Sequence, residues 1–489
     1  MWTKQTIARR TTALLAISAA LALAASSGGQ AAQRRNAAGA KSGDQSWLTF
    51  GFDLERTGYN PDEKILGPDN AAHLHLLWRR DLGGAMIAQP VEAAGVKVHG
   101  RPTDLIYEGT EHGQFFALRA SDGKVVWHRE LGAYDNGTCD FIPGGVYGIS
   151  GAATISMTSP GKGVVYVAGG EGDAYALDLA TGAVRPGWPV SVYDPSRQTV
   201  YSGLALFHGH LYVTTASHCD KPPYYGAAVE ISVASHKIVH RFYPAGRPAG
   251  GISGGGIWGP GGVSIDSKNG EVFTATGNAL TTPQNYLYSE HVVELSSSLS
   301  VLSAVAPKLT GSDADFGSTP VLFRPTGCSE TLTASENKDG AMFIYSEGNP
   351  LGKGHKQKLQ IANVHDSEFV GSPAWDPQTN MLYVSSSSNS SPYKHGLVAL
   401  RAGARCNLKL AWQRAEGKNY SVTSPPSVAN GVVYYGDGPG HTVFAFNART
   451  GKLLWHSSAI HNKIYGAPMV VNGMVVVGSY DQHLDAFGL

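Results

Sequence analysis

The 489-residue sequence has little charge and no excess of either sign. Only 16% of its residues are charged, and 38 lysines and arginines balance 38 aspartates and glutamates. A nucleic-acid partner requires a concentrated positive surface, and no basic stripe is present, so the composition argues against nucleic-acid binding. No lysine- or arginine-rich stretch accompanies an apolar helix, which argues against a membrane-surface role.

Long apolar runs are also scarce. The run at 13–25 follows Lys4, Arg9 and Arg10 and precedes small residues, and it is too short to span a bilayer comfortably. This pattern indicates a signal peptide at 1–25, and hence an exported protein, periplasmic or extracellular, without membrane insertion. The Ala-, Gly-, Ser- and Arg-rich stretch 26–46 is expected to be a disordered linker, which leaves 47–489 as a single domain.

Cysteine is rare, with four residues and no C-x-x-C or C-x-x-C-H motif. The spacing therefore offers no haem attachment site and makes a cysteine metal site the weaker interpretation. Cysteines of exported proteins usually form disulfides, and four of them allow three pairings. We favour Cys139–Cys219 and Cys328–Cys406, because each pair lies in loops of neighbouring repeats.

Glycine, by contrast, is abundant at 61 residues, and much of it belongs to a repeated pattern of the form ALD-x-x-TGK-x-x-W. The clearest copies span 107–127, 166–188 and 434–455, and a truncated copy starts at Val477. A period of roughly 40–50 residues with several strands per repeat is typical of propeller blades. The TG and DG pairs are predicted to be hairpin turns, and the recurring tryptophans to pack between adjacent sheets.

Counting strand openings and closings predicts eight blades, at 85–131, 145–190, 200–243, 253–305, 316–356, 369–414, 421–457 and 464–488. The last repeat lacks an outer strand, and the segment 74–83 carries the missing pattern without a blade of its own. The expected fold is therefore an all-β, eight-bladed propeller of four-stranded antiparallel blades. The N-terminal segment should join the last blade and so close the ring without free edges.

With these repeats and the lead-in at 47–65, the sequence resembles the quinoprotein superfamily of PQQ-dependent, alcohol dehydrogenase-like propellers over essentially all of 47–489. The motif specifies a fold more than a reaction, because non-enzymatic relatives share it. For the enzymatic members the resemblance implies alcohol oxidation. PQQ then lies between a tryptophan and a disulfide of adjacent cysteines, Ca²⁺ polarises the quinone, and an aspartate acts as base.

Three positions match this arrangement. Trp258, at the end of the run GGGIW, is similar to the tryptophan beneath PQQ. Asn278 matches a calcium-ligating asparagine, and Lys338 matches a lysine that reaches the quinone oxygens.

Other positions depart from it. Cys139 stands alone at 138–140, where the capping cysteine pair is expected, and no glutamate stands at 216–220 for the calcium ion. Asn285 aligns with the catalytic aspartate, and an amide does not accept a proton as a carboxylate does. Asp313 or Asp315 is the candidate substitute for that base.

A further group of polar residues lies in loops between blades, where it could form a polar rim or a metal site. None of its spacings resembles a closed zinc site. The group comprises His218, Asp220, His365, Asp366 and Glu368.

Two functional hypotheses follow. The first is an exported propeller with a degenerate cofactor site, which acts as a binding or assembly scaffold for a small-molecule or protein partner at the channel mouth. The second is a divergent PQQ- and Ca²⁺-dependent oxidoreductase similar to polyvinyl-alcohol dehydrogenases. Cys139 and Asn285 favour the scaffold, whereas Trp258, Asn278 and Lys338 favour the enzyme.

Overall fold

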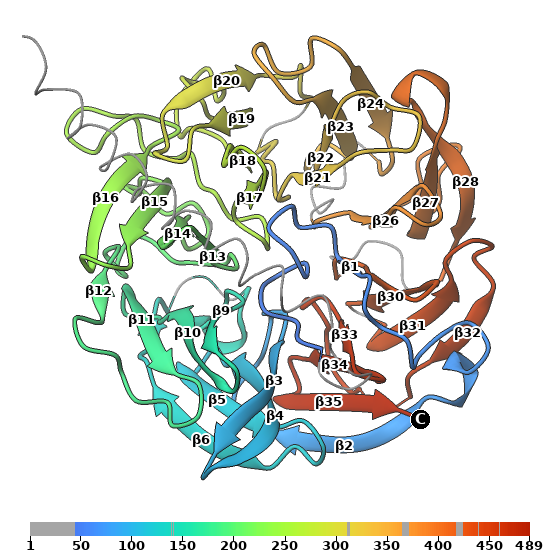
Figure 1. The fold of residues 1–489 in the computed structure, drawn as a ribbon. Coiled ribbons are helices and arrows are strands. Elements are labelled where there is room, and N and C mark those ends of the chain that lie inside the picture. Colours follow the sequence, from blue (N-terminus) through green and yellow to red (C-terminus); the bar gives the residue numbers. More distant parts are fainter. Residues whose placement is uncertain are drawn as a thin grey trace, which may run out of the picture. The chain divides into compact units, whose positions relative to one another are not determined.

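The structure is a computed structural model that describes residues 45–489 except 138, 140, 311–312, 364–370, 417–423, 439 and 459. The expected signal peptide and nearly all of the expected linker lie outside the described residues. Residues Gln45–Leu489 form one compact unit. Eight sheets stand around a common axis as the blades of a propeller, with β13, β17 and β21 near the axis and β16, β20 and β24 at the rim (Figure 1).

Each blade contains four antiparallel strands, which confirms the predicted fold class and the eight predicted blades. The first four blades are β3–β6 (Val91–Val98, Arg101–Gly109, Gln114–Arg119, Val125–Glu130), β9–β12 (Thr154–Ser159, Lys162–Ala168, Asp173–Asp178, Val190–Ser191), β13–β16 (Ala205–Phe207, His210–Thr215, Ala227–Ser232, Lys237–Phe242) and β17–β20 (Ser264–Ile265, Val272–Ala275, Val292–Leu295, Val301–Val305).

The next three blades are β21–β24 (Val321–Phe323, Leu332–Glu336, Ala341–Ser346, Lys356–Gln360), β25–β28 (Ala374–Asp376, Met381–Ser386, Gly396–Ala402, Leu408–Arg414) and β29–β32 (Ser427–Ala429, Val432–Asp437, Thr442–Asn447, Leu453–His456). Blade eight combines β33 (Met469–Val471), β34 (Met474–Gly478) and β35 (His483–Gly488) with β2 (His75–Asp81). The remaining elements are β1 (Tyr59–Asn60), the hairpin β7 (Tyr134–Asp135) and β8 (Val146–Tyr147), and the 3₁₀ turns η1 (Ala71–His73), η2 (Pro143–Gly145) and η3 (Ala404–Cys406).

The ring closes as predicted, because β2 pairs antiparallel with β35 along its whole length. The sequence pattern did not predict the β7–β8 hairpin, nor β1, which adds a fifth strand to blade seven and pairs parallel with β29. Second strands such as β10 are buried on nearly every residue, since neighbouring blades cover both of their faces.

The repeated tryptophans pack between blades, as expected, and they explain the glycine of the TG turn. Trp127 donates its indole N–H to the carbonyl of Leu179 in the next blade at 2.9 Å. A Cβ on Gly182 would lie 2.6 Å from the same indole ring, so only glycine fits beneath it. Trp78 of β2 meets Gly123 in the same way, which locks blade eight against blade one.

The lead-in 47–60 runs around the central channel and bonds to every blade (Figure 1). Each contact joins this segment to an inner strand or to the residue before it. Its partners in blade order are Glu92, Ile155, Leu204, Ile265, Leu322, Trp375, Val428 and Val470. The lead-in is thus an axial tie that holds all eight blades together.

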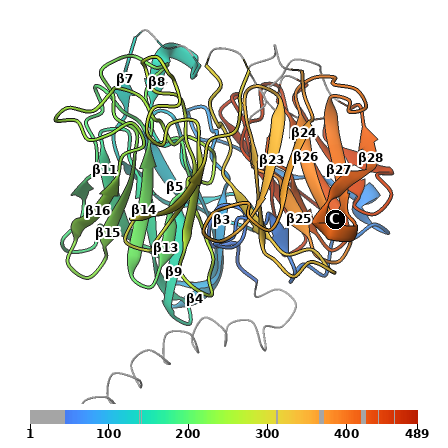
Figure 2. The same cartoon turned by 90° about the horizontal axis from the view of Figure 1, so that it is seen from above.

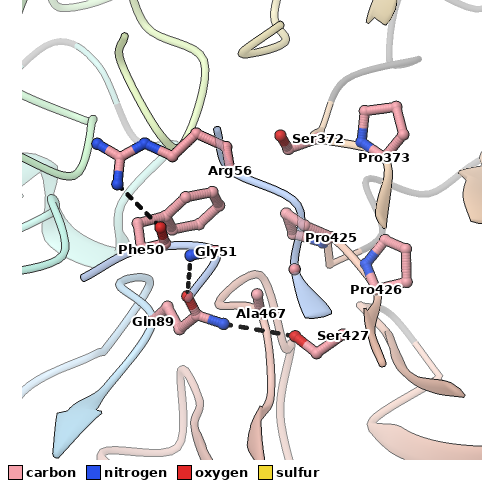
Figure 3. A pocket seen from close by; sticks show the side chains of 11 residues that line it. Phe50, Gly51, Arg56, Gln89, Ser372, Pro373, Pro425, Pro426, Ser427 and Ala467 are labelled. Atoms are coloured by element: carbon pink, nitrogen blue, oxygen red, sulfur yellow. Dashed lines mark hydrogen bonds between the residues drawn. The ribbon is translucent and has the colours of Figure 1, made fainter. Parts of the chain in front are cut away.

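Arg56 lies at the centre of this tie and is only 1% exposed. Its guanidinium donates to the carbonyls of Val263 at 2.9 Å, Phe50 at 2.8 Å and Leu204 at 3.1 Å. Beside it, Gln89 accepts from the Gly51 N–H around a cavity of about 10 Å³ (Figure 3). Such a volume holds about one water, so this part of the channel is filled by protein.

The antiparallel blades divide the loops between two faces of the ring. Connections between second and third strands, and those between consecutive blades, lie on one face, called here the site face. Turns between first and second strands and between third and fourth strands lie on the opposite face. Figure 2 shows the ring edge-on, with the β7–β8 hairpin on the site face and the β9 turn at the other.

Candidate functional site

Loops on the site face of blades three, four and five bring the candidate residues together. Five consecutive connections supply them: β14–β15 gives Asp220, β16–β17 gives Trp258, β18–β19 gives Asn278, β20–β21 gives Asp313 and Asp315, and β22–β23 gives Lys338. The topology therefore converts residues spread over 119 positions of sequence, from 220 to 338, into neighbours on one face.

Lys338 is the centre of this group. Its Nζ donates to Asp315 Oδ2 at 3.0 Å and to Asp313 Oδ2 at 3.1 Å, and it stands 5.0 Å from the centre of the Trp258 ring. Burial by itself would lower the pKa of Lys338, but the two carboxylates outweigh it and raise this pKa. The lysine is therefore a fixed ammonium between two aspartates and an aromatic face.

Asp315 ties Lys338 to Asn278. Its Oδ1 accepts the backbone N–H of Asn278 at 2.6 Å, and the residue is only 4% exposed. A Cβ on Gly277 would lie 2.6 Å from that same oxygen, which explains the glycine before Asn278. Asn278 is 3% exposed, and its side-chain Oδ1 has no hydrogen-bond partner among the described residues. A buried acceptor without a donor is costly, so it points to a ligand.

The glycine run before Trp258 fixes this residue against Asn278. Gly255 N donates to the Asn278 carbonyl at 2.7 Å, and Gly277 N donates to the Gly256 carbonyl at 2.7 Å. Gly254 has φ +120°, and a Cβ there would lie 2.6 Å from the Asn278 carbonyl. Only glycine permits this approach, so the GGGIW run has a geometric role as well as a place in the repeat.

Asp220 completes an acidic cluster with Asp313 and Asp315, in which one oxygen of each lies within 4.8 Å of the others. Tyr224 donates its hydroxyl to Asp220 Oδ1 at 2.6 Å. Burial and then the charge of Asp315 raise the pKa of both Asp220 and Asp313. Three carboxylates face one ammonium here, so the cluster has an excess of negative charge.

An open pocket of about 510 Å³ adjoins this cluster. Its wall includes Ala314, which stands between Asp313 and Asp315, and Glu290, whose pKa is raised to about 7 by burial and then by the charges of Asp315 and Asp313. Asn285 lies on the same wall and is exposed, so the structure places it beside the acidic cluster and not among its carboxylates.

Cys139 is bonded to Cys219, the partner predicted from their positions in loops of neighbouring repeats. The disulfides are Cys139–Cys219 and Cys328–Cys406, which confirms the expected pairing. Cys219 directly precedes Asp220, so the first bridge reaches the acidic cluster.

Of the residues predicted to form a polar rim, Asp220 lies in the acidic cluster and His218 does not. His218 is buried, packs its ring 4.4 Å from that of Tyr147, and lies outside the carboxylate cluster. His365, Asp366 and Glu368 lie outside the described residues. The sequence pattern assigned Asp220 only to this rim and did not single out Glu290. The available signal for Asp220 was a carboxylate at the position where a calcium-ligating glutamate was expected.

Among the helical segments of the described chain, none is both long and apolar enough to cross a membrane.

Comparison with known proteins gives consistent matches. A family model described as "Outer membrane protein assembly factor BamB" matches residues 398–488. Polyvinylalcohol dehydrogenase of Pseudomonas sp is 21% identical over 90% of this chain, and that of Sphingopyxis sp. (strain 113P3) is 23% identical over 77% of it. The chain spans 65% of the length of each of these relatives.

The fold itself matches solved structures. Quinohemoprotein alcohol dehydrogenase from Comamonas testosteroni superimposes with a TM-score of 0.65 at 16% identity, covering 91% of this chain and 80% of that one. At this identity the similarity establishes the shared propeller fold.

Proposed function

The chain is an eight-bladed propeller of the quinoprotein alcohol dehydrogenase-like type with PQQ repeats, and on that premise we propose that it is an exported PQQ- and Ca²⁺-dependent oxidoreductase. Its substrates would be hydroxyl compounds, as the name of its polyvinylalcohol dehydrogenase relatives suggests. The observation that carries the proposal is the convergence of Trp258, Asp315 and Lys338 on one point. The paired disulfides agree with a periplasmic or extracellular location.

The acidic cluster fits a calcium ion. Calcium binds six to eight oxygen ligands, including carboxylates and amide carbonyls. Asp220, Asp313 and Asp315 supply carboxylate oxygens, and the partnerless Oδ1 of Asn278 is an amide oxygen of the expected kind. A divalent cation would also balance the excess charge that three carboxylates leave beside one lysine.

The residues around Trp258 fit a flat anionic quinone. The indole presents an aromatic surface, and the Lys338 ammonium over it supplies donors for quinone or carboxylate oxygens. When bound, PQQ would accept the two electrons of the carbinol C–H bond, and Ca²⁺ would polarise the quinone. The protein's contribution is to orient the cofactor and to remove the hydroxyl proton of the substrate.

Asp313 is the best base for that proton. Both oxygens of Asp315 are taken, one by the Asn278 N–H and one by Lys338, so Asp315 is suited to holding the site together. Asp313 gives Oδ2 to Lys338, while Oδ1 has no hydrogen-bond partner in the described part of the chain. A carboxylate oxygen that is free to accept is what general-base catalysis requires.

The open pocket beside Asp313 would admit the substrate. Hydroxyls, amides, one carboxylate and one lysine line it together with apolar side chains, and the hydroxyl, amide and apolar groups suit a chain that carries hydroxyl groups on a hydrocarbon backbone. The lining residues are Thr281, Thr282, Gln284, Asn285, Glu290, Pro307, Lys308, Leu309 and Ala314.

Dye-linked oxidation of alcohols by the purified protein, reconstituted with PQQ and Ca²⁺, tests the proposal. The panel should contain a small secondary alcohol and a polyvinyl alcohol oligomer. With Ca²⁺ and PQQ both at saturating concentration, Asp313→Asn should lower kcat by about 100-fold or more, because the base is lost. Asp69→Asn, at an exposed aspartate outside the site, is the matched control and should leave kcat unchanged. Dye reduction that is equal in Asp313→Asn and wild type would remove Asp313 from the reaction.

The scaffold hypothesis has one specific observation in its favour. The adjacent-cysteine pair expected at the cofactor is absent, and Cys139 joins a distant cysteine. The relatives and the acidic cluster support the oxidoreductase better. A protein that binds neither PQQ nor Ca²⁺ and retains its fold would return the scaffold to first place.

A further inference from the structure

The two disulfides close loops of nearly equal length on opposite faces of the ring. Their cysteines are separated by 80 and 78 residues. Cys139 lies in the β6–β9 connection and Cys219 in the β14–β15 connection, both on the site face. Cys328 lies in the β21–β22 turn and Cys406 in the β27–β28 turn, both on the opposite face. Loops of equal length restrict the unfolded chain to a similar extent. Any difference between the effects of removing the two bridges must therefore come from their surroundings.

The Cys219 end of the first bridge belongs to the loop that carries Asp220. Cys219 and Asp220 have φ of 50° and 51°, in the left-handed region that residues with a Cβ rarely adopt. Within the loop, Ser217 Oγ accepts the Asp220 N–H at 2.8 Å, and Tyr224 donates to the Asp220 carboxylate at 2.6 Å. Two consecutive left-handed residues persist only where the surroundings restrain them.

The Cys139 end is anchored in the protein. Cys139 is 3% exposed, and the Tyr147 hydroxyl donates to its Sγ at 2.7 Å and to its carbonyl at 3.2 Å. Tyr147 belongs to β8 and packs against His218, the neighbour of Cys219. Through this bridge, the β7–β8 hairpin between blades one and two holds the Asp220 loop of blade three.

We propose that the Cys139–Cys219 disulfide is a positioning element of the metal site, which holds the Asp220 carboxylate at the cluster with Asp313 and Asp315. The proposal rests on the proposed function and deepens it. It gives Cys139 a role different from that of an adjacent-cysteine cap. Asp220 carries one methylene less than the glutamate expected near this position, so its loop must be held closer to the cation.

The test is the affinity for Ca²⁺ in the absence of PQQ, measured by calorimetry and by competition with Tb³⁺, whose luminescence Tyr224 beside Asp220 can sensitise. The double variant Cys139→Ser/Cys219→Ser should lose at least ~10-fold in affinity. The matched control Cys328→Ser/Cys406→Ser should change it less than about twofold, although both should lose similar thermal stability.

A double-mutant cycle separates positioning from general loosening. Asp220→Asn should weaken Ca²⁺ binding, and removal of the Cys139–Cys219 bridge in that background should weaken it no further, because the group that the bridge positions is already gone. Equal losses for the two bridges, or a further loss in the Asp220→Asn background, would overturn the proposal.

A second route covers failure of the serine variant to fold. Cys219 is exposed, so a phosphine added to the folded wild type can reduce this bridge, and with one water molecule the reaction gives two thiols and the phosphine oxide. Reduction should weaken Ca²⁺ binding, and reduction without that effect refutes the proposal. If the oxidised wild type binds neither Ca²⁺ nor Tb³⁺, the metal site of the proposed function fails as well, which distinguishes the two outcomes.

Discussion

Replacing Lys338 with glutamine should change the affinities for PQQ and for Ca²⁺ in opposite directions. Lys338 donates to Asp315 at 3.0 Å and to Asp313 at 3.1 Å, so it occupies carboxylate oxygens that a calcium ion would use. Lys338→Gln removes the charge and leaves those oxygens to the metal. The same change removes the ammonium that would bind an anionic quinone over Trp258.

The magnitudes follow from these contacts. A hydrogen bond to a charged group contributes about 1.5–3 kcal/mol, so PQQ should bind about 10- to 150-fold more weakly. Calcium should bind about tenfold more tightly, because one positive charge leaves its site. Loss of the ion pairs should destabilise the fold by about 2–3 kcal/mol, less than for a fully buried pair, since the Asp313 side chain is 47% exposed.

Calorimetric titrations with Ca²⁺ alone, and with PQQ at saturating Ca²⁺, measure both quantities. Lys358→Gln is the matched control, because Lys358 also meets a carboxylate, Asp339 at 3.6 Å, and an aromatic ring, Phe343 at 5.2 Å, outside the acidic cluster. A parallel loss of both affinities in Lys338→Gln would refute the reasoning, since it would mean that Lys338 supports the site only through folding.

Three further predictions concern the channel, the core and the pocket. Arg56→Met should destabilise the protein by about 4 kcal/mol, because the buried carbonyls of Phe50 and Val263 lose their guanidinium donor, and should lower Tm by about 4 °C for a unit of this size in calorimetry. An unchanged Tm would contradict the axial tie. Glu336 is fully buried without a partner among the described residues, and burial raises its pKa to about 8 from 4.5. The folded state therefore keeps a proton that the unfolded state releases between those values, and stability falls as pH rises through this window. Glu336→Gln should abolish that fall, about 4 kcal/mol at pH 8, and an unaltered Tm difference between pH 5 and pH 8 would count against it. Asn285→Ala should raise KM about fivefold for a hydroxylated oligomer and leave it unchanged for a small alcohol, whereas equal effects on both substrates would exclude the pocket as their path.

The sequence predicted the parts of the fold that repeat. Trp78 lies in a segment that carries the repeat pattern but has no blade of its own, and this pattern predicted that the segment joins the last repeat. In the structure this segment is β2, which pairs with β35. The disulfide partners followed from loop positions in neighbouring repeats. The circular path of 47–60 was not foreseen, because its bonds join backbone groups of eight blades and leave no periodic pattern in the sequence.

The candidate site was predictable only where the repeat is interrupted. Trp258, Asn278 and Lys338 were identified by the resemblance to the quinoprotein family, and the structure brings them together. Asp220 was not assigned to them, because its approach depends on the conformation of an irregular loop and on a bridge to Cys139. The choice of the catalytic base among Asn285, Asp313 and Asp315 depended on the path of the β18–β19 and β20–β21 connections. Sequence spacing does not specify that path.

The most direct test of the central claim is a titration of the purified protein with PQQ, with and without Ca²⁺, followed by calorimetry and by quenching of tryptophan fluorescence. We expect one PQQ per chain, binding that disappears when the calcium is chelated, and a quench that Trp258→Phe removes. Absence of PQQ binding at tens of micromolar cofactor with excess Ca²⁺, in protein whose Tm shows it to be folded, would contradict that claim.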